Sequence, residues 1–258
     1  MDSGVPVQIP AAIPTGAAEH LATAEVTLLG RMPNASNATF LVRLDPAGTE
    51  LPDDENERAQ PLGLAIYKPL RGERPLWDFP PGLHRREVAA YRLSHAAGLH
   101  VVPPTVLRTD APLGEGSLQW FVNADFAEHF FSLFEQRPQL HDQFRALAAF
   151  DVIVNNTDRK SGHCLFEPAT EQVWGIDNGL CFSEDARLRT VIWNFAGEPL
   201  GDTLRAVAAA IADEVPDDVA ELLDDDEVEA MQERAAELTD EGIFPFDRSG
   251  HGYPWPLI

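Results

Sequence analysis

Hydrophobic and polar positions alternate over short stretches within the first 122 residues, a pattern that is typical of β-strands. Segments rich in Gly, Pro, Asn and Asp separate these stretches, as expected for turns. A helical pattern at residues 84–98, which ends at Gly98, lies among them. The predicted strands cover residues 24–29, 39–44, 63–68, 101–108 and 117–122.

A helical period dominates the rest of the chain. Residues 139–154 carry apolar positions at helical spacing, and residues 200–238 are long enough for two or three further helices. Two short apolar runs, 164–166 and 173–176, predict strands between these helical parts. A β-rich part followed by an α-rich part predicts an α+β fold of two packed lobes with a cleft between them.

This organisation divides the chain into three parts. Residues 1–16 are rich in Pro and Ala, and we expect them to form a flexible N-terminal arm. Residues 17–122 form the predicted β-rich N-lobe with one helix, and residues 123–258 form the predicted α-rich C-lobe.

The formal net charge of −23 narrows the choice of partners. A chain this acidic is repelled by nucleic acid and by anionic membrane surfaces, so we expect neither as a partner. Residues 200–241 hold fifteen Asp or Glu and two Arg, which predicts a solvated helical surface; the alternative is a basic protein partner that binds residues 213–241. Residues 66–110 hold seven Lys or Arg and four acids, so we expect a polyanionic ligand such as a nucleotide to bind in this region.

Neither a membrane span nor a secretory signal is predicted. No apolar run approaches the roughly 20 residues needed to cross a bilayer, and the N-terminus lacks a basic start followed by an apolar stretch. Cys164 and Cys181 are a poor disulfide framework for 258 residues, and we expect both to be buried small apolar side chains. The expected location is therefore cytoplasmic.

Four sequence features together suggest phosphoryl-transfer chemistry. The run AIYKP places Lys68 at the end of a predicted strand, and Glu87 lies in the predicted helix nineteen residues later. The segment NNTDRKSGH, residues 155–163, follows a predicted helix. The segment GIDNGLCF, residues 175–182, begins where a predicted strand ends.

Phosphoryl transfer requires a cation on the phosphate oxygens, an anion that orients this cation, metal ligands, and a carboxylate near the attacking hydroxyl. Lys68 and Glu87 supply the first two. One of Asp158 and His163 can act at the nucleophile and the other at a metal. Asp177 supplies a hard oxygen ligand for Mg²⁺.

These segments resemble those of a known family. The patterns D-x-x-x-x-N-T-D-R over residues 151–159 and I-D-N-G-L-x-F over residues 176–182 look like the catalytic and metal-binding loops of type II phosphatidylinositol 4-kinases. They are also similar to the related bacterial toxin–antitoxin kinases, and residues 86–93 resemble the Glu-bearing helix of these enzymes. The resemblance spans residues 28–182 and suggests the phosphatidylinositol 3-/4-kinase-related branch of the protein-kinase-like superfamily.

The resemblance implies the two-lobed protein-kinase-like fold with ATP in the interlobe cleft. Carried over to this chain, Asp158 would be the catalytic Asp and Lys68 the phosphate-binding Lys. Glu87 would be the partner of this Lys, and Asp177 would be the metal ligand. The interlobe hinge, whose backbone meets adenine, would consist of Gln119, Trp120, Phe121 and Val122, and the last three are the expected nucleotide contacts.

The chain departs from the family pattern at three places. His163 stands where the family has a metal-binding Asn; an imidazole can bind Mg²⁺ but suits softer ions such as Mn²⁺ or Zn²⁺ better. The phosphate loop MPNASNATF contains no glycine, so its contacts to phosphate would come from Ser36, Asn37 and Thr39. Lys160 replaces the usual His or Gly after Asp-Arg and adds a positive charge beside the substrate.

Each candidate also has a structural interpretation that the sequence leaves open. Lys68 and Glu87 could be ordinary surface residues, and His163 could be a packed side chain. Asp177 could be an Asx-turn residue that precedes Gly179. The phosphate-loop residues could form only a hairpin turn, and the hinge residues could form a plain core strand.

The expected function is transfer of the γ-phosphoryl of ATP, with Mg²⁺ or Mn²⁺, to a hydroxyl of a protein or a soluble small molecule. Asp158 would orient this hydroxyl, while Lys68, the metal and Lys160 stabilise charge. His163 and the glycine-free loop leave open a nucleotide-binding regulator with weak or no catalytic activity. Phosphatidylinositol phosphorylation, which the net charge disfavours, and nucleotidyl transfer are further alternatives.

Overall fold

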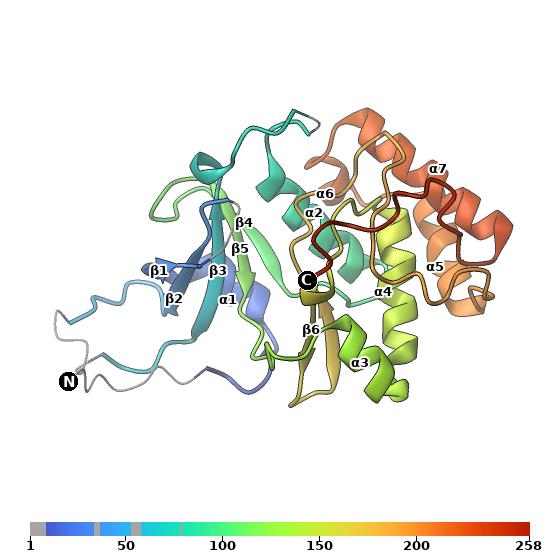
Figure 1. Ribbon diagram of the computed structural model, residues 1–258. Coiled ribbons are helices and arrows are strands. Elements are labelled where there is room, and N and C mark those ends of the chain that lie inside the picture. The colour runs from blue at the N-terminus through green and yellow to red at the C-terminus, as the bar shows by residue number, and fades with distance from the viewer. Residues whose placement is uncertain (1–8, 34–36, 53–57, 78) are drawn as a thin grey trace.

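The computed structural model describes residues 9–33, 37–52, 58–77 and 79–258. A five-stranded sheet forms one side of the molecule, and a mainly helical part forms the other (Figure 1). This is the α+β fold class that the sequence predicts. Within the described ranges, no helix combines the length and the apolar character needed to cross a membrane.

The sheet has the strand order β1-β2-β3-β5-β4, and every neighbouring pair is antiparallel. Its strands are β1 (Glu25–Arg31), β2 (Phe40–Asp45), β3 (Gly63–Pro69), β4 (Thr105–Arg108) and β5 (Gly116–Trp120). Strand β3 is central, and Lys68 near its end lies opposite Ser117 of β5. Helix α1 (Ala17–Thr23) packs on β4 and β5, and its Leu21 shares an apolar core with Leu44 and Leu118 of the sheet.

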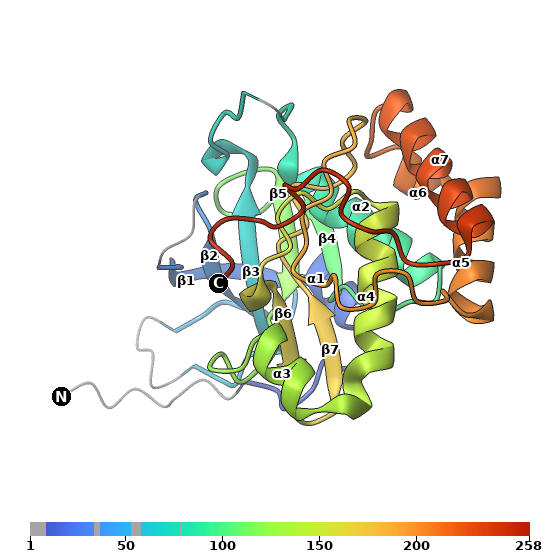
Figure 2. The ribbon, with the colours of Figure 1, turned by 45° about the vertical axis from the view of Figure 1, so that its right-hand side comes forward.

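The helical part is built around a second, larger core. It consists of α3 (Phe130–Gln136), α4 (His141–Ile153), β6 (Cys164–Glu167), β7 (Gln172–Gly175), α5 (Asp202–Asp213), α6 (Asp217–Ala220) and α7 (Asp225–Glu241). Strands β6 and β7 form an antiparallel hairpin, and α5 packs against α7. After α7, the chain runs back across the helical part and ends beside the short 3₁₀ turn Ser161–His163 (Figures 1 and 2).

Helix α2 (Leu83–Ala96) joins the two parts. It contacts β4 and β5, and its Ala90 and Leu93 belong to the core of the helical part. Its buried Arg86 forms an ion pair with the buried Glu227 of α7. Because α2 is held from both sides, a side chain on this helix has a fixed place between the two parts.

Several elements differ from the sequence-based expectation. The strand predicted at 101–108 begins only at Thr105, because Pro103 and Pro104 have no N–H for a strand ladder. Helices α1 and α3 were not predicted; each has only seven residues, too few for a clear periodic pattern. Of the arm expected over residues 1–16, residues 9–16 are described, and the Ile13 N–H donates a hydrogen bond to the Glu167 carboxylate at 3.0 Å.

The N-terminus of α2 is capped by a carboxylate from a preceding loop. Glu73 accepts hydrogen bonds from the backbone N–H groups of Gly82 and His84 at 2.9 and 2.8 Å, and from the His84 ring at 2.8 Å. The other ring nitrogen of His84 lies 2.9 Å from the carboxylate of Glu115. Burial alone would lower the pKa of His84, but the hydrogen bonds to these two carboxylates raise it. Burial would likewise raise the pKa of Glu73, but the bonds from His84 and Gly82 lower it to about 2.

A buried ion pair joins α4 to the loops that follow it. Arg159 and Asp151 are both fully buried and are joined by several hydrogen bonds of 3.0–3.1 Å. The same guanidinium donates to the Ile176 carbonyl and to the Asn178 side chain, each at 2.6 Å. The Asp151 carboxylate also accepts a bond from Thr190 at 3.1 Å. One ion pair therefore fixes three separate loop segments relative to α4.

Replacing Asp151 by Asn is expected to destabilise the protein strongly. The change leaves the buried Arg159 charge without its counter-ion, a loss on the order of 3–5 kcal/mol. Urea unfolding of Asp151→Asn measures it. The matched control is Asp142→Asn on the same helix, where the carboxylate is 96% exposed and pairs with Arg145, so the midpoint stays nearly unchanged. Equal midpoint shifts in the two variants would contradict this role.

The capping network predicts a pH dependence of stability. Since the pKa of His84 is raised in the folded state, its stabilising contribution is complete below about pH 6.5 and is lost as the pH rises through the folded pKa. The unfolding free energy is therefore expected to decrease over this window, and His84→Gln is expected to remove the decrease. Unfolding at a series of pH values checks this; parallel profiles for both proteins would refute it.

Candidate functional site

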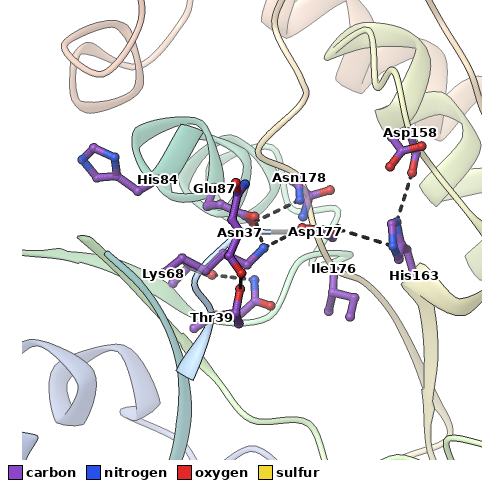
Figure 3. Close-up of polar contacts among 12 residues, drawn as sticks. Asn37, Thr39, Lys68, His84, Glu87, Asp158, His163, Ile176, Asp177 and Asn178 are labelled. Carbon is purple, nitrogen blue, oxygen red and sulfur yellow. Dashed lines mark hydrogen bonds and ion pairs between the residues drawn. The ribbon is translucent and has the colours of Figure 1, made fainter. Parts of the chain in front are cut away.

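Three charged side chains meet where the sheet faces the helical part. Lys68 comes from β3, Glu87 from α2, and Asp177 from the turn after β7 (Figure 3). The Lys68 ammonium lies 2.7 Å from the Asp177 carboxylate and also forms an ion pair with Glu87. The Glu87 side chain is only 3% exposed, whereas half of Asp177 is open to solvent. Glu87 and Asp177, which follow Lys68 by 19 and 109 positions in the sequence, thus both contact its ammonium group.

The charges of this triad support one another. Burial alone would lower the pKa of Lys68, but the carboxylates of Asp177 and Glu87 raise it well above its usual value. The Lys68 ammonium in turn holds the pKa of Asp177 well below its usual range. Lys68 and Asp177 are therefore both ionised at neutral pH, and the ammonium contacts two carboxyl groups.

Asp177 is placed by its own backbone and by its neighbour. Its φ of 60° is in the left-handed region, which Asp adopts more readily than most residues. The next N–H, that of Asn178, donates to Glu87 at 3.0 Å, and the Asn178 side-chain oxygen accepts from Arg159. The turn is thus fixed between α2 and the buried Asp151–Arg159 pair.

His163 lies on the other side of Asp177. Its Nδ1 is 3.0 Å from the Asp158 carbonyl, which can only accept, so Nδ1 carries the proton. Burial lowers the pKa of His163, so the ring is neutral at pH 7 and its Nε2 presents a lone pair. This Nε2 lies 3.4 Å from the second oxygen of Asp177.

Two acceptors that face each other in this way fit a cation between them. Two ligands each about 2.1 Å from one ion lie roughly 3–3.4 Å apart, and a ligating His commonly donates its other N–H to a carbonyl. Within the described part of the chain, no cluster of three or more His, Cys, Asp and Glu could hold a metal. Asp177 and His163 therefore suit an ion that takes its remaining ligands from phosphate or water, as Mg²⁺ does.

Asp158 and Lys160 form a separate pair at the start of the same loop. The Lys160 ammonium lies 2.8 Å from the Asp158 carboxylate, and both side chains are about three-quarters buried. The backbone N–H of Asp158 donates to the Asn156 side chain at 2.9 Å. Both lysines of the chain, Lys68 and Lys160, therefore lie at this site.

The predicted phosphate loop is less open than expected. Ser36 lies outside the described residues. The Asn37 side-chain oxygen accepts the backbone N–H of Arg74 at 3.0 Å, and the Thr39 hydroxyl donates weakly to the Asn37 carbonyl at 3.5 Å. Asn37 thus already joins this loop to the segment after β3.

The predicted hinge residues have different environments. The Trp120 ring is buried in the apolar core that the sheet shares with α1. The N–H groups of Trp120 and Phe121 donate to the carbonyls of Pro104 and Leu64. Among the described residues, the Val122 N–H has no hydrogen-bond acceptor. Of the three, Val122 is buried and is the residue whose amide makes no hydrogen bond within the described residues.

Two residues that hold the site together were not identified as such from the sequence. These residues are Arg159 and Asn178: Arg159 donates a hydrogen bond to the Asn178 side chain and so orients the turn that carries Asp177. Arg159 directly follows Asp158, and Asn178 directly follows Asp177. The signal for Arg159 was Asp151, a lone acid in the apolar stretch ALAAFDVIV, because a buried acid requires a buried partner.

The amino-acid sequence is similar to a known family and to a known protein. The model of the family described as phosphatidylinositol 3- and 4-kinase matches residues 85–237. The chain is 35% identical over 284 aligned positions to protein Rv2133c of Mycobacterium tuberculosis, and the alignment covers 93% of this chain and 95% of that protein.

Three solved structures match the chain to different degrees. The structure of hydra Fam20 with sugar matches with a TM-score of 0.53 at 14% identity, over 92% of this chain and 91% of that one. The Golgi casein kinase with Mn/ADP bound has a TM-score of 0.46 at 14% identity, over 95% and 80%. The Helicobacter pylori proinflammatory kinase CtkA has a TM-score of 0.43 at 15% identity, over 87% and 94%. The likeness to Fam20 is one of fold, and it agrees with the predicted two-lobed kinase-like fold.

The family match covers more than half of the chain and includes Glu87, Asp158, His163 and Asp177, while Lys68 precedes it. The resemblance expected from the two loop motifs is thereby confirmed. The chain belongs to the phosphatidylinositol 3- and 4-kinase family, a branch of the protein-kinase-like superfamily of phosphotransferases.

Proposed function

We propose that this protein transfers the γ-phosphoryl group of ATP to a hydroxyl group of a soluble acceptor. The observation that carries the proposal is the shared ammonium of Lys68, which contacts Glu87 and Asp177 from two other segments. A cation held between an orienting acid and a metal-ligand acid is the arrangement that phosphoryl transfer needs. Structural explanations for each residue alone do not account for their meeting at one point.

Lys68 and Glu87 would act on the phosphates. In the proposed complex, the Lys68 ammonium leaves Asp177 and binds phosphate oxygens, while the buried Glu87 keeps its position. The exposed half of Asp177 makes this exchange feasible, because its carboxylate stays solvated when the lysine leaves. Val122, with its free N–H, is the proposed backbone contact of the adenine.

Asp177 and His163 would hold the divalent cation. When bound, Mg²⁺ or Mn²⁺ neutralises charge on the phosphates during transfer. Asp177 contributes a carboxylate oxygen and His163 a neutral Nε2, with Nδ1–H fixed on the Asp158 carbonyl. A nitrogen ligand favours Mn²⁺ over Mg²⁺ more than an oxygen ligand does. With His163 as a ligand, the site would therefore accept Mn²⁺ as well as Mg²⁺.

Asp158 would orient the acceptor hydroxyl and take its proton. Its carboxylate is partly solvent-exposed and is held by Lys160. The Lys160 ammonium lies 2.8 Å from this carboxylate. A phosphoryl group that is transferred beside Asp158 would therefore also lie near Lys160, which would stabilise its developing negative charge. Placing the base and this cation on one short loop keeps their spacing constant.

A catalytically inactive nucleotide-binding regulator is the competing function. Two features suggest it: His163 stands where the family has a metal-binding Asn, and the Asn37 side chain of the predicted phosphate loop is already hydrogen-bonded to the Arg74 N–H. The two functions differ in turnover, since both predict that ATP with a divalent cation raises the melting temperature. Binding without consumption of γ-labelled ATP would favour the regulator.

Asp158→Asn is expected to lower phosphoryl transfer by about 10²–10⁴-fold, because the amide cannot accept the hydroxyl proton. The same variant is expected to keep its melting-temperature shift with ATP and Mg²⁺, since the Asp158 carboxylate pairs with Lys160 and not with Lys68. Transfer from γ-labelled ATP into cell extract measures the first effect. Asp142→Asn, at an exposed carboxylate, is the control and retains transfer. Unchanged transfer in Asp158→Asn would overturn the proposed catalytic role.

His163→Asn is expected to shift the metal preference from Mn²⁺ toward Mg²⁺, because an amide oxygen replaces a ring nitrogen. The readout is the melting-temperature shift with ATP at graded concentrations of each ion. His100→Asn is the matched control: His100 is exposed and has a φ of 49°, which Asn tolerates well. An identical Mn²⁺-to-Mg²⁺ ratio in wild type and His163→Asn would exclude His163 as a ligand.

A further inference from the structure

A cavity of about 430 Å³ opens beside the Asp158 carboxylate. Its walls are Asp158, Arg189 and the C-terminal tail, here residues 247–258, which contributes His251, Tyr253 and Trp255. Cavities of this size hold small molecules. Asp158 lines it and none of the side chains of the Lys68–Glu87–Asp177 triad does, as expected of a site for the acceptor in the proposed reaction.

The tail is built into the site at defined points. The Gly252 carbonyl accepts hydrogen bonds from the Thr190 N–H and the Trp193 ring, each at 2.9 Å. The Leu257 carbonyl accepts the N–H of Ser161, inside the loop that carries Asp158, at 2.8 Å. Asp247 folds the turn that precedes these contacts by accepting the N–H groups of residues 249, 250 and 252.

The C-terminal tail, which forms one wall of the cavity, lies outside the part of the chain that matches the family. The match ends at residue 237, ten residues before the tail begins. The loop with Asp158 therefore comes from the shared part of the molecule, whereas much of the cavity beside it comes from a segment outside that part. An acceptor in this cavity would therefore be recognised partly by tail residues that lie outside the family match.

The charge of the cavity points to an anionic ligand. The Asp158 carboxylate already has a counter-ion in Lys160. The backbone of Arg189 is fixed by two hydrogen bonds: its N–H donates to the Asn156 carbonyl, and its carbonyl accepts the N–H of Arg159. Arg189 is an exposed residue, and its guanidinium forms no ion pair or hydrogen bond within the described residues. A fixed backbone thus presents an uncompensated positive charge at the cavity, in a chain whose net charge is −23.

The tail supplies flat, amphipathic surfaces beside this charge. Tyr253 is 53% exposed and Trp255 is 87% exposed, although both are large aromatic residues. Aromatic side chains that combine an apolar face with one polar group are common in ligand sites. The Asp158–Arg189 cavity thus combines a base, a free cation and aromatic walls.

Resting on the proposed phosphotransferase function, we infer that this cavity binds the acceptor, and that the acceptor is a small hydroxyl compound with an anionic group held by Arg189. The anionic group is a phosphate ester or a carboxylate, since the guanidinium binds either through two parallel hydrogen bonds. In the transfer, the acceptor oxygen forms a bond to the γ-phosphorus and its proton passes to Asp158. The bond from this phosphorus to the bridging oxygen breaks, and ADP leaves with the electron pair.

The acceptor class is tested by fractionating an extract of the cells that make this protein. The extract is divided into lipid, protein and dialysable fractions, and the dialysable fraction is split on an anion exchanger. Each is incubated with the full chain, γ-labelled ATP and Mg²⁺. Label is expected in the dialysable molecules that the exchanger retains. Pretreatment with alkaline phosphatase then separates the two sources: loss of labelling identifies a phosphate ester, and retention identifies a carboxylate.

The outcomes separate this inference from the proposed function. Label that enters only the protein, lipid or unretained dialysable fraction overturns the anionic small acceptor and leaves phosphoryl transfer standing. Absence of label from every fraction, with ATP binding intact, contradicts the proposed function itself.

The role of Arg189 is tested by kinetics on the retained fraction. Arg189→Gln is expected to raise the apparent KM for the acceptor about tenfold or more, because a charge-assisted bond is lost, while the KM for ATP changes less than about twofold. Arg248→Gln, on the tail but outside the cavity and 80% exposed, is the matched control. Trp255→Ala provides a second variant, expected to raise the acceptor KM only. An unchanged acceptor KM in both cavity variants refutes the assignment.

Discussion

The geometry of this protein depends on one buried ion pair, Asp151 with Arg159. Neither group contacts solvent, so neither is stable without the other. Through its remaining donors, Arg159 reaches the Ile176 carbonyl and the Asn178 side chain. The turn that carries Asp177 is therefore positioned from the end of α4, and Asp158 immediately precedes the same arginine in the loop that follows α4. A single electrostatic constraint sets the spacing between the proposed base and the proposed metal ligand.

The second constraint is α2, which brings Glu87 to the same place from the other side. Its N-terminus is capped by Glu73 and its middle is tied to α7 by Arg86 and Glu227. Glu87 then receives both the Lys68 ammonium and the Asn178 N–H. The strand, the helix and the turn thus share one chain of contacts that meets at Glu87. Arg189 differs from these groups: its backbone is held by hydrogen bonds, but its guanidinium has no partner in the part of the chain that the structure describes.

Much of the fold could be predicted from the sequence, because the elements with clear periods are long. The predicted helices at 84–98 and 139–154 correspond to α2 and α4, and four of the five strands of the sheet were located within one or two residues. The early part of 101–108 could not be a strand because of two prolines, and the seven-residue helices α1 and α3 gave too short a pattern. For the site, motif spacing indicated Lys68, Glu87 and Asp177. It could not reveal Arg189 and the tail, because their approach to Asp158 depends on long-range contacts of Gly252 and Leu257.

The central claim is that Lys68 binds the nucleotide, and the composition of the chain allows a direct measurement. Lys68 and Lys160 are its only lysines, so amine acylation followed by mass spectrometry reports on few sites. The account predicts that ATP with Mg²⁺ slows acylation of Lys68 several-fold relative to the N-terminal amine, since the ammonium is then covered by phosphate. Acylation of Lys68 at the same rate with and without saturating nucleotide would contradict it.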